Sequence, residues 1–228
     1  MEEAIIIEKS VIIIAVFAIT MLFAMYCTLA ERKIAAWIQD RRGPNRAGPG
    51  GIFQPLADGL KLFAKEEFMP NTPNTFLFVL GPFISMTMAL MTSAVIPWGD
   101  SLVIGGRTVI LQAADINVAM LYVFAVLSVS VYGVMIGGWA SNNKYSLISA
   151  MRVASQMISY EIAMGLSIVA ILMMHSSMSL REIAAGQHEM HWNIFYQPIG
   201  FFIFLICSFA ETNRTPFDLA ECEQELIG

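Results

Sequence analysis

Five long apolar stretches constrain this chain more than any other feature of its sequence. A helix of about 18 or more apolar residues can cross the hydrocarbon core of a bilayer, which is about 30 Å thick. Four of the stretches carry no charged residue, and one carries only Glu161. The shortest, at 18 residues, would extend about 27 Å as a helix. The stretches are residues 10–30, 76–97, 116–140, 153–174 and 193–210.

The composition supports the same class of protein. Hydrophobic residues make up 57% of the 228 and charged residues only 14%, against about 25% charged residues in soluble domains. Such a chain cannot cover a water-facing surface. We therefore expect an all-α, polytopic bundle of five membrane spans, forming a single membrane domain over residues 1–228. The acidic N-terminus favours a retained first helix over a cleaved signal peptide.

The basic residues between the spans are unevenly distributed, which predicts an orientation. Ten of the thirteen lie in segments 31–75, 141–152 and 211–228, and three lie on the other side. By the positive-inside rule, the first set faces the cytoplasm and the N-terminus lies outside. The ten are Arg32, Lys33, Arg41, Arg42, Arg46, Lys61, Lys65, Lys144, Arg152 and Arg214. We expect the plasma membrane of a bacterium in preference to the mitochondrial inner membrane.

The first inner segment contains an unusual loop. Residues 41–54 read RRGPNRAGPGGIFQ, and their glycines and prolines exclude one regular helix. Before the loop, residues 31–40 can continue the first helix into the inner interface. After it, residues 55–68 place apolar side chains at a helical spacing, which predicts an amphipathic helix lying on the membrane plane.

Glu161 is the first candidate for chemistry. A carboxylate within a span costs at least about 2.5 kcal/mol unless it faces partners or water. We interpret Glu161 as a proton-relay residue. The alternative is an acid that reaches back to the interface or bonds once to Tyr160 or Ser159.

The last eighteen residues, ETNRTPFDLAECEQELIG, form a second candidate because they are strongly acidic. Thr215 and Pro216 are typical of a helix start. The spacing alone favours a solvated acidic face, whereas crowded like charges near a membrane can also raise one another's pKa values and pass protons. The acids are Glu211, Asp218, Glu221, Glu223 and Glu225.

Other patterns carry weaker signals. His188 and His191 are more typical of an ordinary loop than of a metal pair. Gly133 and Gly137 form a G-x-x-x-G pattern, which predicts close helix packing. The three cysteines lie far apart, so an iron–sulfur or zinc site in this chain is not expected. No Walker loop or dinucleotide fingerprint is present, and nothing indicates nucleic-acid binding.

Three segments together resemble the H-subunit family of NADH-quinone oxidoreductase (respiratory complex I), also called the NADH dehydrogenase subunit 1 family. They read ERKIAAWIQDRRGPNRAGPGGIFQPLADGLKLFAKEE (31–67), RVASQMISYE (152–161) and AETNRTPFDLAECEQEL (210–226). Cys222 and Gln224 stand where small residues are common in the family. The family has eight membrane helices and this chain would supply five, so we expect a copy truncated at its C-terminus.

The resemblance implies a quinone-binding, proton-translocating subunit of a translocase. NADH and the iron–sulfur clusters would belong to partner subunits, this chain would bind no cofactor, and quinone would be a substrate. The partners would be peripheral quinone-site subunits, small neighbouring membrane subunits and the lipid bilayer. Glu161 and the five acids above would carry protons. The quinone tunnel and its entrance would contain Arg32, Arg41, Arg42, Arg46 and Asp58.

Three alternatives remain at this point. A related membrane subunit of an energy-converting hydrogenase or formate hydrogenlyase would not use quinone as a substrate. The complete acidic loop argues against this alternative. An ion transporter or channel would predict broken helices or inverted repeats, which the sequence does not indicate. A purely structural anchor would not need the costly acid at Glu161.

Overall fold

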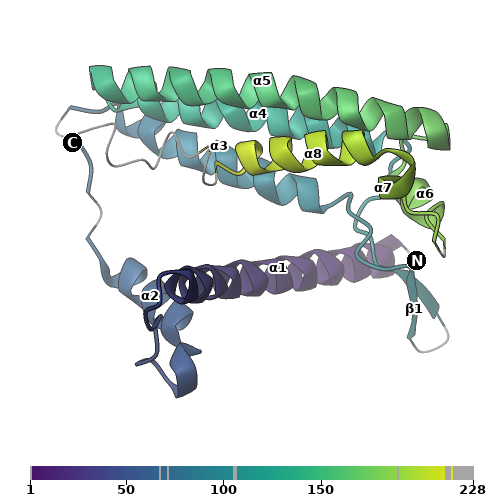
Figure 1. Ribbon diagram of the computed structural model, residues 1–228, viewed down its shortest axis with the longest axis horizontal. Coiled ribbons are helices and arrows are strands. Elements are labelled where there is room, and N and C mark those ends of the chain that lie inside the picture. Colours follow the sequence, from purple (N-terminus) through teal and green to yellow (C-terminus); the bar gives the residue numbers. More distant parts are fainter. Residues whose placement is uncertain are drawn as a thin grey trace. The chain divides into compact units, whose positions relative to one another are not determined.

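The computed structural model describes residues 2–66, 68–70, 72–104, 107–188, 190–213 and 217. They belong to two compact units, Met1–Met69 and Pro70–Gly228, which are described separately. Helices predominate in both units, and the only sheet in the described ranges is a two-stranded hairpin. The predicted all-α membrane class is confirmed. The elements are drawn in Figure 1.

The first unit consists of a long helix, a glycine-rich loop and a short helix. Helix α1 (Glu2–Ile38) continues well past residue 30, as predicted. A 3-10 turn (Pro49–Gly51) lies within the loop. Gly48 and Gly51 have positive φ angles, and a Cβ on Gly51 would collide with the carbonyl of Pro44. Lys33 Nζ donates to the carbonyl of Gly50 at 2.6 Å, which ties the loop back to α1.

Helix α2 (Gln54–Ala64) is the predicted amphipathic helix, although it ends four residues earlier than expected. Its start is favoured by Pro55, which fits the first turn of a helix. Leu56, Leu60 and Phe63 follow the i, i+4, i+7 spacing and are exposed within their unit. They give α2 an apolar stripe suited to the surface of a membrane.

The second unit is a helical bundle with a small hairpin at one end. Its elements are α3 (Thr75–Ser93), β1 (Ser101–Ile104), β2 (Arg107–Ile110), α4 (Ala119–Ala140), α5 (Lys144–His175), α6 (Leu180–Ala185), α7 (Asn193–Tyr196) and α8 (Pro198–Glu211). Helix α4 packs against α3 and α5, and α5 packs against α8. We call the end that carries β1 and β2 the hairpin end; α3 and α5 run toward it, and α4 and α8 run away from it (Figure 1).

Small residues bring α3 and α4 into close contact. A Cβ on Gly81 would lie 2.8 Å from the carbonyl oxygen of Gly133 and 3.0 Å from the Cα of Gly137. The G-x-x-x-G pattern therefore serves helix packing, as predicted. Helices α5 and α8 meet differently, through a buried cluster of Met164, Ile168 and Cys207.

Four helices in the described ranges are long and apolar enough to cross a membrane: residues 8–38 of α1, and α3, α4 and α5. The fifth predicted stretch is divided at Gln197, whose backbone is not helical, and Pro198 begins α8. The 14 residues of α8 extend only about 21 Å. Glu211, its last residue, therefore lies partway across a bundle whose other helices are longer.

The hairpin was not predicted. β1 and β2 pair antiparallel, with Ser101 opposite Ile110. Arg181 of α6 forms ion pairs with the residues on both sides of the hairpin. The nitrogen–oxygen distances are 3.6 Å to Asp100 and 3.4 Å to Asp115. The ion pairs connect the two loops at this end of the second unit.

Candidate functional site

Two carboxyl groups lie at matching heights on the packed helices α5 and α8. Glu161 is 14 residues before His175, the last residue of α5, and Glu211 is 13 residues after Pro198, the first residue of α8. Because the helices are antiparallel, both positions lie about 20 Å from the hairpin end. If both groups were ionised, their negative charges would repel each other.

Glu161 has a hydrogen-bonding partner on a third helix. Its Oε1 contacts Ser128 Oγ of α4, and the same hydroxyl lies 2.9 Å from the carbonyl of Phe124. The two partners considered from the sequence are engaged differently: Ser159 Oγ donates to Ser155 O at 2.7 Å, and the Tyr160 ring packs on Phe217. Glu161 is half-buried and faces the bundle.

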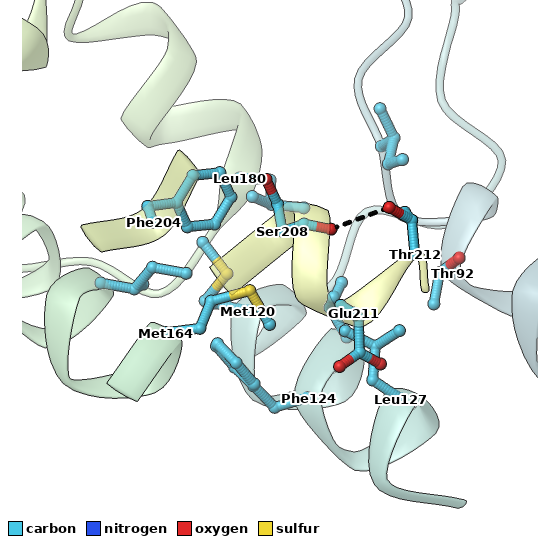
Figure 2. Close-up of a pocket in the computed structure, with 13 residues that line it drawn as sticks. Thr92, Met120, Phe124, Leu127, Met164, Leu180, Phe204, Ser208, Glu211 and Thr212 are labelled. Carbon is cyan, nitrogen blue, oxygen red and sulfur yellow. Dashed lines mark hydrogen bonds between the residues drawn. The ribbon is translucent and has the colours of Figure 1, made fainter. Parts of the chain in front are cut away.

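Glu211 borders a mainly apolar cavity of about 330 Å³ formed by α3, α4, α5, α6 and α8. Figure 2 shows its carboxyl group beside Phe124 and Leu127 of α4. Its Oε2 atom is buried and has no hydrogen-bond partner among the described residues. The wall also holds the hydroxyls of Thr92, Ser208 and Thr212. An unsatisfied carboxyl oxygen in such surroundings favours the protonated form or a bound water.

Phe217 connects the acidic segment to α5. Gln156 Nε2 donates to the carbonyl oxygen of Phe217 at 2.9 Å. The Phe217 ring meets Tyr160 edge to face, with a centroid distance of 5.1 Å. Gln156 and Tyr160 are four residues apart and share one face of α5. Of the predicted acidic loop, Asp218, Glu221, Glu223 and Glu225 lie outside the described residues, as do Arg214 and the expected helix start at Thr215 and Pro216.

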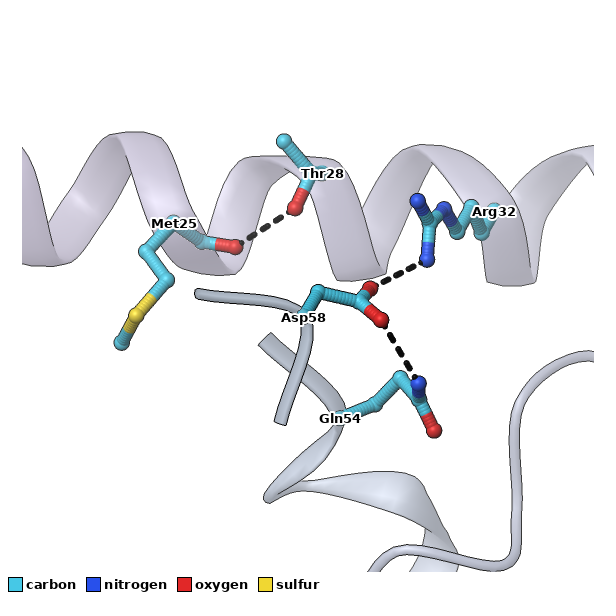
Figure 3. Close-up of polar contacts among 5 residues, drawn as sticks. All are labelled: Met25, Thr28, Arg32, Gln54 and Asp58. Atoms are coloured by element: carbon cyan, nitrogen blue, oxygen red, sulfur yellow. Dashed lines mark hydrogen bonds and ion pairs between the residues drawn. The ribbon is translucent and has the colours of Figure 1, made fainter. Parts of the chain in front are cut away.

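In the first unit, two predicted entrance residues form an ion pair. Arg32 Nη1 of α1 lies 2.6 Å from Asp58 Oδ2 of α2, and Gln54 Nε2 donates to Asp58 Oδ1 at 3.0 Å (Figure 3). The hydrogen bond from Gln54 and then the one from Arg32 hold the pKa of Asp58 below its ordinary value. Asp58 therefore carries a fixed negative charge at neutral pH.

The remaining predicted entrance residues lie in the exposed loop that follows α1. Arg41 Nε donates to Gln39 Oε1 at 2.6 Å, which bends its side chain back toward the end of α1. Arg42 and Arg46 are exposed. Their guanidinium groups are well suited to meet an anion or a carbonyl oxygen.

Sequence reasoning missed Ser128, Gln156 and the Arg181 ion pairs. Serines in apolar helices usually bond to their own backbone, so composition alone does not distinguish Ser128 from its neighbours.

The described histidines show no sign of a metal site. His191 Nδ1 lies 2.6 Å from the Tyr196 hydroxyl. No group of three or more metal-ligating side chains gathers in the part of the chain that the structure describes.

Comparison with known proteins identifies a family of related sequences. A family model described as NADH dehydrogenase matches residues 10–228. The H subunit of NADH-quinone oxidoreductase from Flavobacterium psychrophilum is 72% identical over all 228 residues, and that from Flavobacterium johnsoniae is 71% identical. An H subunit of the same enzyme from Cytophaga hutchinsonii is 62% identical over 97% of the chain.

The chain spans about two thirds of the length of these relatives: 66%, 65% and 65%, respectively. Within that span the match is nearly continuous, and it includes the helices that carry Glu161 and Glu211. Its apolar helices make it a multi-pass membrane protein. The family match over almost its whole length shows that the chain belongs to the NADH dehydrogenase family.

Proposed function

We propose that this chain is the quinone-binding, proton-translocating membrane subunit of an NADH:quinone oxidoreductase in a bacterial plasma membrane. The family match and the names of its relatives support this role. In the proposed complex, NADH and the redox centres belong to peripheral partner subunits, and small membrane subunits flank this chain. The N-terminus lies outside, in agreement with the excess of basic residues in the opposite segments.

The paired carboxyls of Glu161 and Glu211 are the single observation that carries the proposal. Charged carboxylates within a membrane bundle are costly, and two that repel each other are costlier still. In this proposal, a proton passes between the two carboxyl groups. A site that holds one proton between two helices can accept it from one side and release it toward the other.

In this proposal, the change in charge of the quinone on reduction drives the movement of protons. Electrons delivered to the quinone by a partner subunit leave it negatively charged until it takes up protons. The basic loop with Arg41, Arg42 and Arg46, together with the Arg32–Asp58 pair, forms the entrance and tunnel on the inner side. In this proposal, Glu211, Asp218, Glu221, Glu223 and Glu225 carry protons together with Glu161.

The decisive experiment replaces Glu161 in the assembled complex. Glu161→Gln keeps the shape and hydrogen bonding of the side chain but cannot exchange a proton at working pH. We expect normal assembly with coupled quinone reduction lowered about tenfold or more. Glu161→Asp should retain part of the activity, because the group still titrates but is one methylene shorter.

The measurement is NADH-driven quinone reduction and proton pumping in membranes with equal amounts of assembled complex. Glu182→Gln is the matched control, since Glu182 is an acid on α6, near the hairpin end. Wild-type rates in Glu161→Gln would leave Glu161 as a structural acid and end the proposal.

A further inference from the structure

The hydroxyl of Ser128 lies close to two hydrogen-bond acceptors but can donate only one hydrogen bond. It contacts Glu161 Oε1 of α5 and lies 2.9 Å from the carbonyl oxygen of Phe124, one turn back on its own helix. A serine hydroxyl can donate one hydrogen bond and accept others, while an ionised carboxylate and a carbonyl can only accept. Ser128 therefore cannot donate to both at once.

We propose that Ser128 is a positioning residue that holds Glu161 against α4 in both protonation states by reversing the direction of its own hydrogen bond. This inference rests on the proposed proton-carrying role of Glu161 and names the group that keeps its side chain in place while its charge changes.

Each protonation state has a complete set of hydrogen bonds. When Glu161 is ionised, Ser128 donates to Oε1, and the Phe124 carbonyl keeps the backbone bond expected within a helix. When Glu161 is protonated, its own O–H donates to Ser128 Oγ, and Ser128 turns its proton to the second lone pair of the Phe124 carbonyl. The hydroxyl rotates and no heavy atom needs to move.

The other polar groups around Glu161 are poorly suited to replace Ser128. Ser159 on α5 donates to the backbone at Ser155, and the Tyr160 ring packs on Phe217. On α8, an ionised Glu211 would repel an ionised Glu161. Without Ser128, an ionised Glu161 loses this donor, so its side chain is expected to turn away from the bundle.

The test compares serines on the same helix in the assembled complex. Ser128→Ala removes the hydroxyl that contacts Glu161, and Ser128→Thr restores a hydroxyl. Ser130→Ala is the matched control, because Ser130 Oγ donates to the backbone of its own helix, at Leu127 O, 2.7 Å away. The readouts are coupled quinone reduction and the infrared carbonyl band of protonated Glu161, identified as the band that Glu161→Gln removes.

We expect Ser128→Ala to shift the Glu161 carbonyl band and to lower coupled activity about tenfold, as losing a hydrogen bond to a charged group would. Ser128→Thr should restore both, and Ser130→Ala should change neither. An unshifted band in Ser128→Ala, or an equal shift in Ser130→Ala, would overturn the inference. A shifted band alongside full activity of Glu161→Gln would instead leave the contact intact and refute the proposed function.

Discussion

The two units hold pairs of polar side chains that differ in sign and surroundings. Arg32 and Asp58 of the first unit are opposite charges, and their side chains are 55% and 35% exposed. Glu161 and Glu211 of the second unit are two acidic groups in an apolar bundle. An exposed pair of opposite charges keeps both charges over a wide pH range. Two carboxylates in low dielectric repel each other, so ionising both costs more than ionising one.

The comparison is tested most strongly at the carboxyl pair. If Glu161 and Glu211 hold a proton together, Glu211→Gln should lower coupled quinone reduction about as severely as Glu161→Gln. The double variant should then be little worse than either single variant, because residues that act as one unit give non-additive losses. The measurement is proton pumping and quinone reduction at equal complex content.

Thr212→Val offers a nearby control, since the Thr212 hydroxyl donates to the backbone at Ser208 O, 3.1 Å away. Two independent losses that multiply in the double variant would show that the carboxyls do not work as a pair.

A smaller effect on activity is expected from changes at the contact between Phe217 and α5. Gln156→Leu removes the donor to the Phe217 carbonyl while keeping a side chain of similar size. We expect coupled activity to fall a few-fold, because a typical hydrogen bond contributes about 1 kcal/mol. Tyr160→Phe should be nearly neutral, since it retains the ring that meets Phe217.

Rates of coupled quinone reduction in the two α5 variants, measured side by side, separate these contributions. A loss in Tyr160→Phe that exceeds the loss in Gln156→Leu would assign the effect to the tyrosine hydroxyl instead of the carbonyl contact.

The smallest effect is expected at the exposed pair. The pKa of Asp58 is lowered, first by Gln54 and then by Arg32. A group with a lowered pKa contributes stability above its unfolded value of about 3.9, and this contribution disappears as the pH falls through the lowered value. Asp58→Asn should therefore reduce the melting temperature of the complex slightly, and by the same amount at pH 6 and pH 8.

Thermal unfolding at the two pH values checks this, with Glu66→Gln as the control because Glu66 is an exposed acid of the same unit. A penalty in Asp58→Asn that changes markedly between the two values would mean that Asp58 titrates near neutral pH and resembles the membrane pair after all.

Much of the fold could be predicted because membrane helices are determined by local composition. The extension of α1 past residue 30, the amphipathic α2 and the close approach at Gly133 all follow from residues near one another in the sequence. The division at Gln197 and Pro198 was missed because apolar length was counted across the proline. Proline cannot donate a backbone hydrogen bond, so it begins helices more readily than it continues them.

The site was only half predictable for a different reason. A lone acid in an apolar helix is conspicuous, so Glu161 could be identified directly. Its partner Ser128 depends on how α4 and α5 are rotated about their axes, and α4 also carries Ser130 two residues later. The sequence contains no local signal that distinguishes these serines. Likewise, the height of Glu211 depends on where α8 begins.

The short length of α8 has an electrical consequence. Because α8 ends partway along the bundle, its terminal carboxyl and its neighbour on α5 lie at neither face of the second unit. If that unit spans an energised membrane, a proton reaching these carboxyls from one face crosses only part of the voltage, and its departure crosses the remainder. A full crossing costs about 2.3 kcal/mol per 100 mV, so a carboxyl pair at this depth divides the electrical work into two smaller steps.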